Sequence, residues 1–104
     1  MSINKFPNLK YLFLEECDVG VIKDLPTLKS LILKNCKIHK IQLQDLNILK
    51  IKNNLLHIDI ESHTIGTVIL RKNKGSVNFL IKNTIEKWDV KETVDFYIKY
   101  RPDL

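Results

Sequence analysis

Leucine and isoleucine return along the chain at a nearly constant step. Four copies of one apolar triplet occur, at Leu9, Leu12 and Leu14, at Leu28, Leu31 and Leu33, at Leu46, Leu49 and Ile51, and at Ile65, Val68 and Leu70. Internal repetition with a period of roughly 20 residues is typical of a solenoid. The last two positions of each triplet are alternate residues, so both side chains point to one face of a strand. Because so short a strand cannot bury that face alone, the pattern predicts copies stacked as a parallel sheet.

Each copy continues to a small polar position just after the triplet. It holds Cys17, Cys36, Asn54 and Asn73 in turn. An amide at this position can bond backbone groups of its own coil and of the next one, and a thiol can be a weak donor in the same small slot. The complete pattern, L-x-x-L-x-L-x-x-N/C-x-L, resembles the leucine-rich repeat and covers residues 6–75.

The resemblance implies a leucine-rich-repeat solenoid of the α/β class, here mostly β, with a short curved parallel sheet. The step between copies is short for this family and leaves too few residues for a full helix on the convex side. We therefore expect extended segments or single 3₁₀ turns there. Four isoleucines of these segments are expected to pack inward: Ile22, Ile41, Ile58 and Ile60.

The repeat is expected to break after Gly75, and the remaining chain predicts a terminal strand and a capping helix. In residues 76–85, Val77, Phe79 and Ile81 alternate with other residues as in a strand. A hairpin through residues 72–75 and an abbreviated last coil both account for it. Residues 89–101 begin with the capping pattern Asp89-x-x-Glu92 and carry apolar residues at helical spacing. We expect a helix there that covers the open end of the stack and is anchored by Trp88.

Length and charge add only general limits. A chain of 104 residues is expected to form a single domain, residues 1–104. The 17 basic and 12 acidic residues give a net charge of +5, and the basic residues are spread along the chain. They indicate either a solvated surface or attraction to an acidic partner. With two cysteines, no secretory signal and no membrane-spanning apolar run, the expected location is intracellular and cytoplasmic.

The candidate site consists of side chains that flank the inward pair of each predicted strand and therefore face outward. One column across the strands is mostly apolar, and the next holds one acid followed by three bases. Like charges in adjacent strands repel, and an exposed apolar stripe adds little to folding, so both features favour a docked partner. The residues predicted to bind it are Tyr11, Phe13, Ile32, Lys34, Lys50, Lys52, Ile69 and Arg71.

The resemblance implies that the concave sheet face binds a protein, because leucine-rich-repeat domains mostly do so. We therefore predict a non-catalytic protein–protein interaction module for an acidic or amphipathic protein. Nucleic-acid binding through the basic ladder is one alternative, and a structural subunit of a larger assembly is another. The first strand has little cover, so it is either polar enough to leave the protein monomeric or a contact edge for self-association.

The remaining histidines, carboxylates and cysteines give little indication of a catalytic or metal site. His57-x-Asp59-x-Glu61-x-His63 would share one face of a strand, but alternate residues lie about 6.8 Å from each other. This pattern is therefore better explained by polar side chains that alternate on a solvent-exposed face than by a metal site. Cys17 and Cys36 are expected to be free thiols that pack inward, although their spacing would permit a disulfide. No phosphate-binding loop or metalloprotease motif occurs, so no enzyme, cofactor or metal is predicted.

Overall fold

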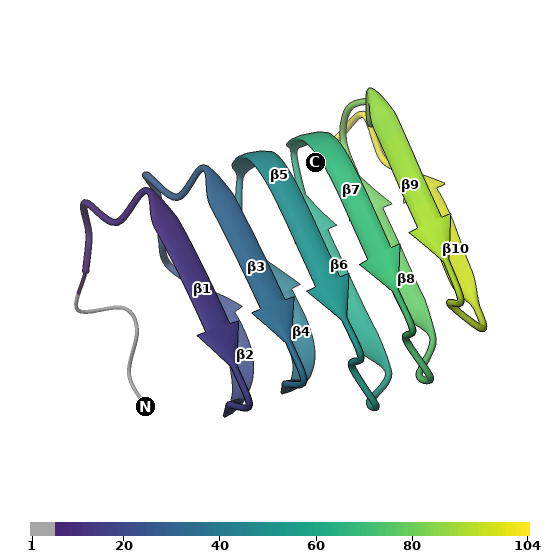
Figure 1. Ribbon diagram of the computed structural model, residues 1–104. Coiled ribbons are helices and arrows are strands. Elements are labelled where there is room, and N and C mark those ends of the chain that lie inside the picture. The colour runs from purple at the N-terminus through teal and green to yellow at the C-terminus, as the bar shows by residue number, and fades with distance from the viewer. Residues whose placement is uncertain (1–5) are drawn as a thin grey trace.

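The computed structural model describes residues 6–104, which form ten strands in two parallel sheets (Figure 1). The front sheet contains β1 (Tyr11–Glu15), β3 (Ser30–Lys34), β5 (Asp45–Lys52), β7 (Thr64–Arg71) and β9 (Lys87–Lys91). The back sheet contains β2 (Asp18–Lys23), β4 (Lys37–Gln42), β6 (Ile58–Ser62), β8 (Val77–Ile81) and β10 (Phe96–Tyr100). Each coil supplies one strand to each sheet, so the chain is a β-solenoid of five coils. The predicted repeat solenoid is confirmed.

The strands pair in the register that the apolar repeat requires. Leu12 lies beside Leu31, which lies beside Leu49, and the same rows continue through β7 to β9. These aliphatic rows of the front sheet face matching rows of the back sheet across one core. The four isoleucines expected to pack inward are fully buried: Ile22, Ile41, Ile58 and Ile60. Their burial removes the apolar face of each short strand from water, which no coil could achieve alone.

Each coil turns out of the front sheet at the same corner. The residue after each front strand has a positive φ, between 51° and 57°: Glu16, Asn35, Asn53, Lys72 and Glu92. The buried polar position follows directly. There the Asn54 amide donates to Leu56 O and, in the neighbouring coil, to Ile38 O, at 2.9 and 3.2 Å. The predicted role of the amide, which is to bond its own and the adjacent coil, is confirmed.

The extended segments expected opposite the front sheet are confirmed, but the leucine-rich-repeat type of solenoid is wrong. The extended segments form a second continuous parallel sheet, and residues 6–104 contain no 3₁₀ turn. A horseshoe curves because its convex side is built from elements wider than a strand, such as helices about 10 Å across. In this protein successive coils are separated by the strand spacing of about 4.8 Å in both sheets. Because the two sides of the stack are equally long, a difference in width does not curve it.

The capping helix predicted over residues 89–101 is also wrong. Those residues contain β9, the turn that follows it, and β10. A fifth repeat occupies this part of the chain, in which Ile85, Trp88, Val90 and Thr93 align with Ile65, Val68, Leu70 and Asn73. Trp88 therefore anchors no helix. It lies in β9, where its ring meets the edge of Phe79 at a centroid distance of 5.2 Å.

Both explanations for the terminal strand fail as well. Val77–Ile81 runs parallel to β6, so it is not the second arm of a hairpin through residues 72–75. It is the back-sheet strand of the fourth coil and pairs along its whole length, so the coil is not abbreviated. Within residues 6–104 there is no helix long and apolar enough to cross a membrane.

Candidate functional site

The structure brings the eight predicted binding residues together on the outer surface of the front sheet, which we call the front face. Phe13, Ile32, Lys50 and Ile69 form one row across the strands, and Asp89 of β9 extends it. Glu15, Lys34, Lys52 and Arg71 form the neighbouring row, and Lys91 extends it. Sequence reasoning predicts both rows but misses their fifth members, because the local pattern of residues 89–101 favours a helix.

Two aromatic side chains are the most exposed large apolar groups of the front face. Tyr11 is 72% exposed and Phe13 is 58% exposed, both on β1. Ile48, two strands away in the same row as Tyr11, is 39% exposed and was not among the eight. Ile32 and Ile69 are half-buried. The apolar part of the face is therefore concentrated at the N-terminal end of the stack.

Two residues of the basic row, Lys34 and Arg71, form ion pairs with acids of the front face. Lys34 lies 3.3 Å from Glu15, and the Arg71 guanidinium lies 2.6 Å from the Asp89 carboxylate. Arg71 also donates to the backbone oxygen of Asp89 at 2.8 Å. The hydrogen bond from Arg71 is the main cause that lowers the pKa of Asp89, while partial desolvation acts in the opposite direction. Arg71 is therefore engaged within the protein.

Three other lysines of the front face, Lys50, Lys52 and Lys91, have no salt-bridge partner among residues 6–104. Lys50 and Lys52 lie two positions apart on β5, and Lys52 is directly beside the engaged Lys34 and Arg71 in register. Neighbouring cations about 4.8 Å apart raise the local positive potential, so these two ammonium groups are the best placed to attract an anion.

A basic groove borders the front face at the corner where the coils turn. It has a volume of about 450 Å³, and we call it the corner groove. Its polar lining comes from adjacent coils: Lys34, Asn35, Lys52, Asn53, Lys72, Asn73, Lys74 and Glu92. Asn53 donates to Asn35 at 2.7 Å, which ties two neighbouring corners together. The sequence signal for this groove is the recurrence of Asn and Lys at the end of each front strand and just after it.

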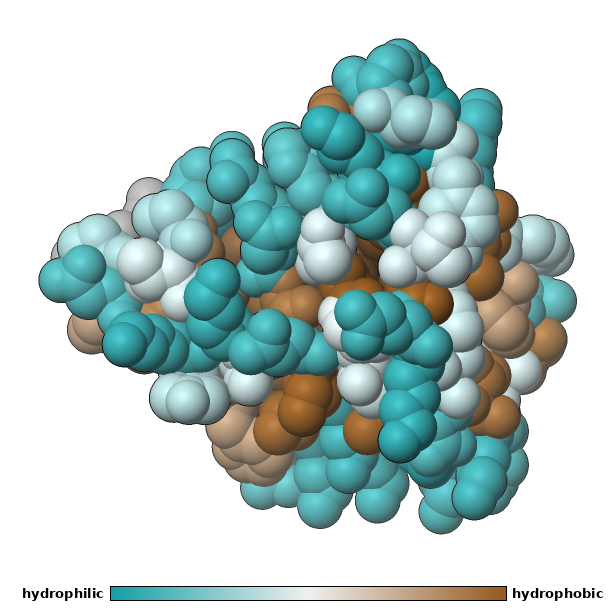
Figure 2. Space-filling model, turned by 90° about the horizontal axis from the view of Figure 1, so that it is seen from above, coloured by the Kyte–Doolittle hydropathy of each residue, from teal (hydrophilic) through white to brown (hydrophobic). Residues whose placement is uncertain are grey.

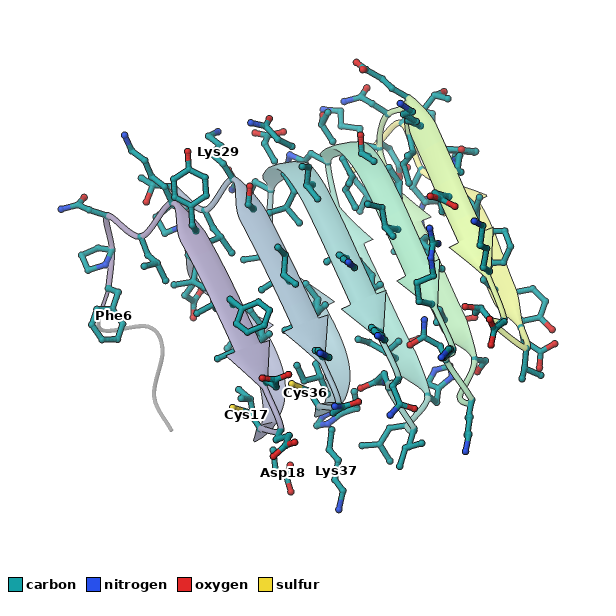
Figure 3. The ribbon with its side chains drawn as sticks, in the orientation of Figure 1. Phe6, Cys17, Asp18, Lys29, Cys36 and Lys37 are labelled. Carbon is teal, nitrogen blue, oxygen red and sulfur yellow. The ribbon has the colours of Figure 1, made fainter. Side chains whose placement is uncertain are left out.

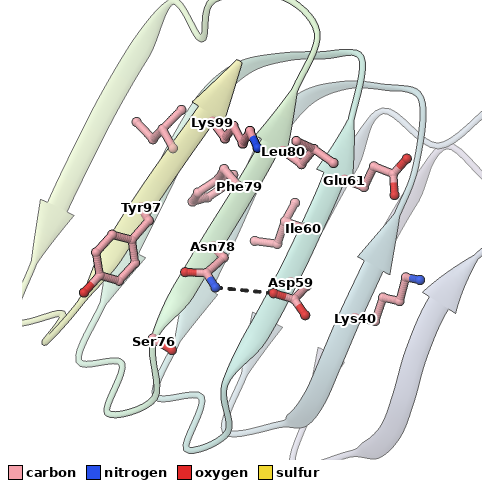
Figure 4. A pocket seen from close by; sticks show the side chains of 11 residues that line it. Lys40, Asp59, Ile60, Glu61, Ser76, Asn78, Phe79, Leu80, Tyr97 and Lys99 are labelled. Atoms are coloured by element: carbon pink, nitrogen blue, oxygen red, sulfur yellow. Dashed lines mark hydrogen bonds between the residues drawn. The ribbon is translucent and has the colours of Figure 1, made fainter. Parts of the chain in front are cut away.

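The outer surface of the back sheet carries a second groove, of about 530 Å³ (Figure 4). In its floor Asn78 donates to Asp59 at 3.5 Å. Asp59 also contacts His57 Nε2 at 2.9 Å, and the other ring nitrogen of His57 contacts the Ser76 hydroxyl. Of the predicted His/Asp/Glu alternation, only His57 and Asp59 are brought into contact. Among the described residues no three His, Cys, Asp or Glu side chains are placed to hold a metal ion.

The two cysteines lie at the same corner of neighbouring coils (Figure 3). Both are free thiols, as expected, and Cys36 is buried whereas Cys17 is half-buried. Cys36 Sγ donates to Leu14 O of the preceding coil at 3.4 Å, and Cys17 Sγ donates to Glu15 O at 3.3 Å. The thiols thus take the place that the asparagine amides take in later coils.

Comparisons of the chain with protein-family models, with curated proteins and with solved structures found no match. The resemblance to the leucine-rich repeat therefore rests on the sequence pattern alone. The geometry of two parallel sheets departs from that family, so the function has to be inferred from the surface itself.

Proposed function

We propose that the front face binds an acidic or amphipathic protein segment, and that this protein is a non-catalytic protein–protein interaction module. One observation carries the proposal. Two largely exposed aromatic side chains, Tyr11 and Phe13, share a sheet face with two lysines that lack an ion pair in the described chain, Lys50 and Lys52. Neither feature stabilises the fold. Exposed aromatic residues are common anchors of protein contacts. Unpaired lysines beside them attract acidic side chains.

The rows of the front face suggest how a partner would lie. The row of Phe13, Ile32 and Ile69 and the row of Lys34 and Lys52 both cross the strands, at alternate positions along each strand. That separation is about 6.8 Å. A partner lying across the strands would place apolar side chains over the first row and carboxylates over the second. An amphipathic helix has this layout, since its residues three and four apart share a face.

The test compares two matched double variants. Phe13→Ala with Lys52→Glu removes an aromatic anchor and reverses a charge on the front face. Val21→Ala with Lys40→Glu makes the corresponding change on the back sheet, where these two residues are in register. In a pull-down from native cells read by mass spectrometry, we expect the wild type and the back-sheet variant to retain a common protein that the front-face variant loses. If all three capture the same proteins equally, the front face is not the binding surface.

Nucleic-acid binding is a second candidate, and the corner groove favours it. Four lysines, Lys34, Lys52, Lys72 and Lys74, line this groove and could contact successive phosphates. Its described lining contains no aromatic ring on which a base could stack. Fluorescence anisotropy with mixed RNA and DNA at low salt would decide it. Binding with a steep salt slope supports this candidate, and a flat titration removes it.

A structural subunit of a larger assembly is the third candidate, and it would use the ends of the stack instead of its faces.

We place the protein in a reducing, cytoplasmic compartment, because both of its thiols are unpaired and one is buried as a hydrogen-bond donor.

A further inference from the structure

The last coil leaves the end of the core open to solvent. In β10, Phe96, Ile98 and Tyr100 occupy the register positions of Val77, Phe79 and Ile81, which are buried in β8. No strand of residues 6–104 lies on the other side of β10, and its three side chains are 38%, 36% and 43% exposed. Hydrophobic residues reach the surface at the end of the stack that carries β9 and β10 (Figure 2). Contiguous exposed apolar side chains of this kind are typical of interaction sites.

The same end carries two unpaired strand edges. Within the described chain β9 pairs only with β7, and β10 pairs only with β8. Each therefore presents a row of N–H and C=O groups that can pair with another chain. The described chain turns back from β10 toward the preceding coils (Figure 1), so no strand of residues 6–104 covers either edge.

A second copy that stacks head to tail gains no net charge complementarity. Continuing the rows of the solenoid would place its first coil on β9 and β10. Four charged pairs would then form: Lys99 over Lys23, Glu92 over Glu16, Lys91 over Glu15, and Glu86 over Lys10. The two pairs of like charge offset the two pairs of opposite charge, because opposed like charges on adjacent strands destabilise a sheet. A head-to-tail contact would also repeat without closing and give fibres.

A two-fold arrangement of the C-terminal ends avoids these conflicts. We propose that two copies associate through their last coils, with β9 of each pairing antiparallel with β10 of the other. Asp89 of one copy then lies opposite Lys99 of the other, and this happens twice by symmetry. Trp88 lies opposite Tyr100 and Val90 opposite Ile98, so inward side chains meet inward side chains.

Among residues that lie within β9 and β10, charge favours the proposed register. A shift of two positions in one direction sets Lys87 against Lys99, and a shift in the other direction sets Lys91 against Lys99. A shift of one position would turn the inward side chains of one strand outward. In the proposed register Lys87 comes opposite Arg101, which lies just beyond β10 and is already engaged by Asp103.

The chemistry of Asp89 allows the new contact. This carboxylate is engaged with Arg71 through Oδ2, which leaves Oδ1 for a lysine of the second copy. The two-fold contact buries both open ends and is closed, so association stops at two chains.

Light scattering after size exclusion tests the association. The wild type should have twice the mass of the chain at micromolar concentration. Lys99→Glu keeps the fold, because the side chain is exposed, but opposes Asp89 with a second acid. We expect it to raise the dissociation constant at least tenfold. Lys23→Glu, an exposed lysine at the other end of the stack, should leave the mass unchanged. A monomeric wild type at high concentration would overturn the proposal.

Cysteine cross-linking tests the register. Paired residues of antiparallel strands lie about 4.5–5.5 Å apart between Cα atoms, within the range for a disulfide. With Cys17 and Cys36 replaced by Ser and Ala, a mixture of Asp89→Cys and Lys99→Cys chains should form a disulfide-linked dimer on oxidation. Neither variant alone should do so. Cross-linking of Lys99→Cys to Lys23→Cys chains instead would establish head-to-tail stacking and reject the two-fold contact.

Discussion

Asn73 is the side chain whose loss should reveal how neighbouring coils are held together. It is fully buried and bonds groups of neighbouring coils. Its Oδ1 accepts from the backbone N–H of Asn54 at 3.0 Å, and its Nδ2 donates to Ile51 O at 3.1 Å. The same Nδ2 donates to the Thr93 hydroxyl at 3.3 Å. Asn73→Ala removes all three contacts at once.

The loss of stability in Asn73→Ala depends on which buried polar groups it leaves without a hydrogen-bond partner. The Asn54 N–H loses its side-chain partner inside the core. The Ile51 carbonyl lies in the paired strand β5 and loses only a second hydrogen bond. Leaving a buried polar group unsatisfied costs about 1–3 kcal/mol, so the free energy of unfolding should fall by about that amount. The Thr93 hydroxyl retains its bond to Lys91 O at 3.3 Å and adds little.

Urea denaturation followed by the fluorescence of Trp88, the single tryptophan, measures this change. All variants should be compared at one protein concentration, since association at the C-terminal end would raise the apparent stability. Asn83→Ala is the matched control. Its exposed amide bonds only the Thr64 hydroxyl, so we expect a change within about 0.5 kcal/mol. A loss below about 1 kcal/mol for Asn73→Ala would refute the assignment of the buried amide as a link between coils.

Two further predictions concern a close backbone approach and a surface ion pair. Gly75→Ala should reduce the free energy of unfolding by about 3 kcal/mol in the same assay, because its Cβ would overlap the backbone of the neighbouring coil at Leu56. Gly20→Ala, where the nearest atom is 3.4 Å away and φ is +80°, should cost about 1–2 kcal/mol. Hydrogen bonding to Arg101 lowers the pKa of Asp103 to about 2, so this pair stabilises the protein above the unfolded pKa near 3.9 and the effect is lost as the pH falls through about 2. The fall in the urea midpoint between pH 4 and pH 2 should be shallower in Asp103→Asn, and an unchanged slope would show that the ion pair does not form in solution.

The outward rows of the front face could be predicted because a strand alternates its faces strictly. Once Leu12 and Leu14 are assigned to the core, Tyr11 and Phe13 can only point outward. The regular step between copies then places Lys34 beside Lys52 without further information. The engagement of Arg71 by Asp89 could not be predicted in this way, since the local pattern around Asp89 favours a helix.

The last coil shows why local pattern failed. Val90, Val94 and Tyr97 have helical spacing, and Asp89 with Glu92 has the form of a helix cap. The competing signal is a fifth apolar triplet that begins at Ile85. It has Trp88 where earlier copies have an aliphatic residue, and Thr93 where they have Cys or Asn. Pairing with β7 and β8 along the whole of β9 and β10 outweighs the helical propensity of so short a segment, because tertiary contacts override weak local preferences.

By itself the sequence determined the repeat, the inward aliphatic rows and the polar corner, because each depends only on spacing along one chain. The tertiary structure decided that the second side of every coil is also a sheet, and that the stack ends on exposed Phe96, Ile98 and Tyr100. Those features depend on which strands lie next to each other in space. A strand in the fourth coil and a strand in the fifth carry similar apolar patterns, and only the presence of a neighbour on both sides makes one buried and leaves the other open.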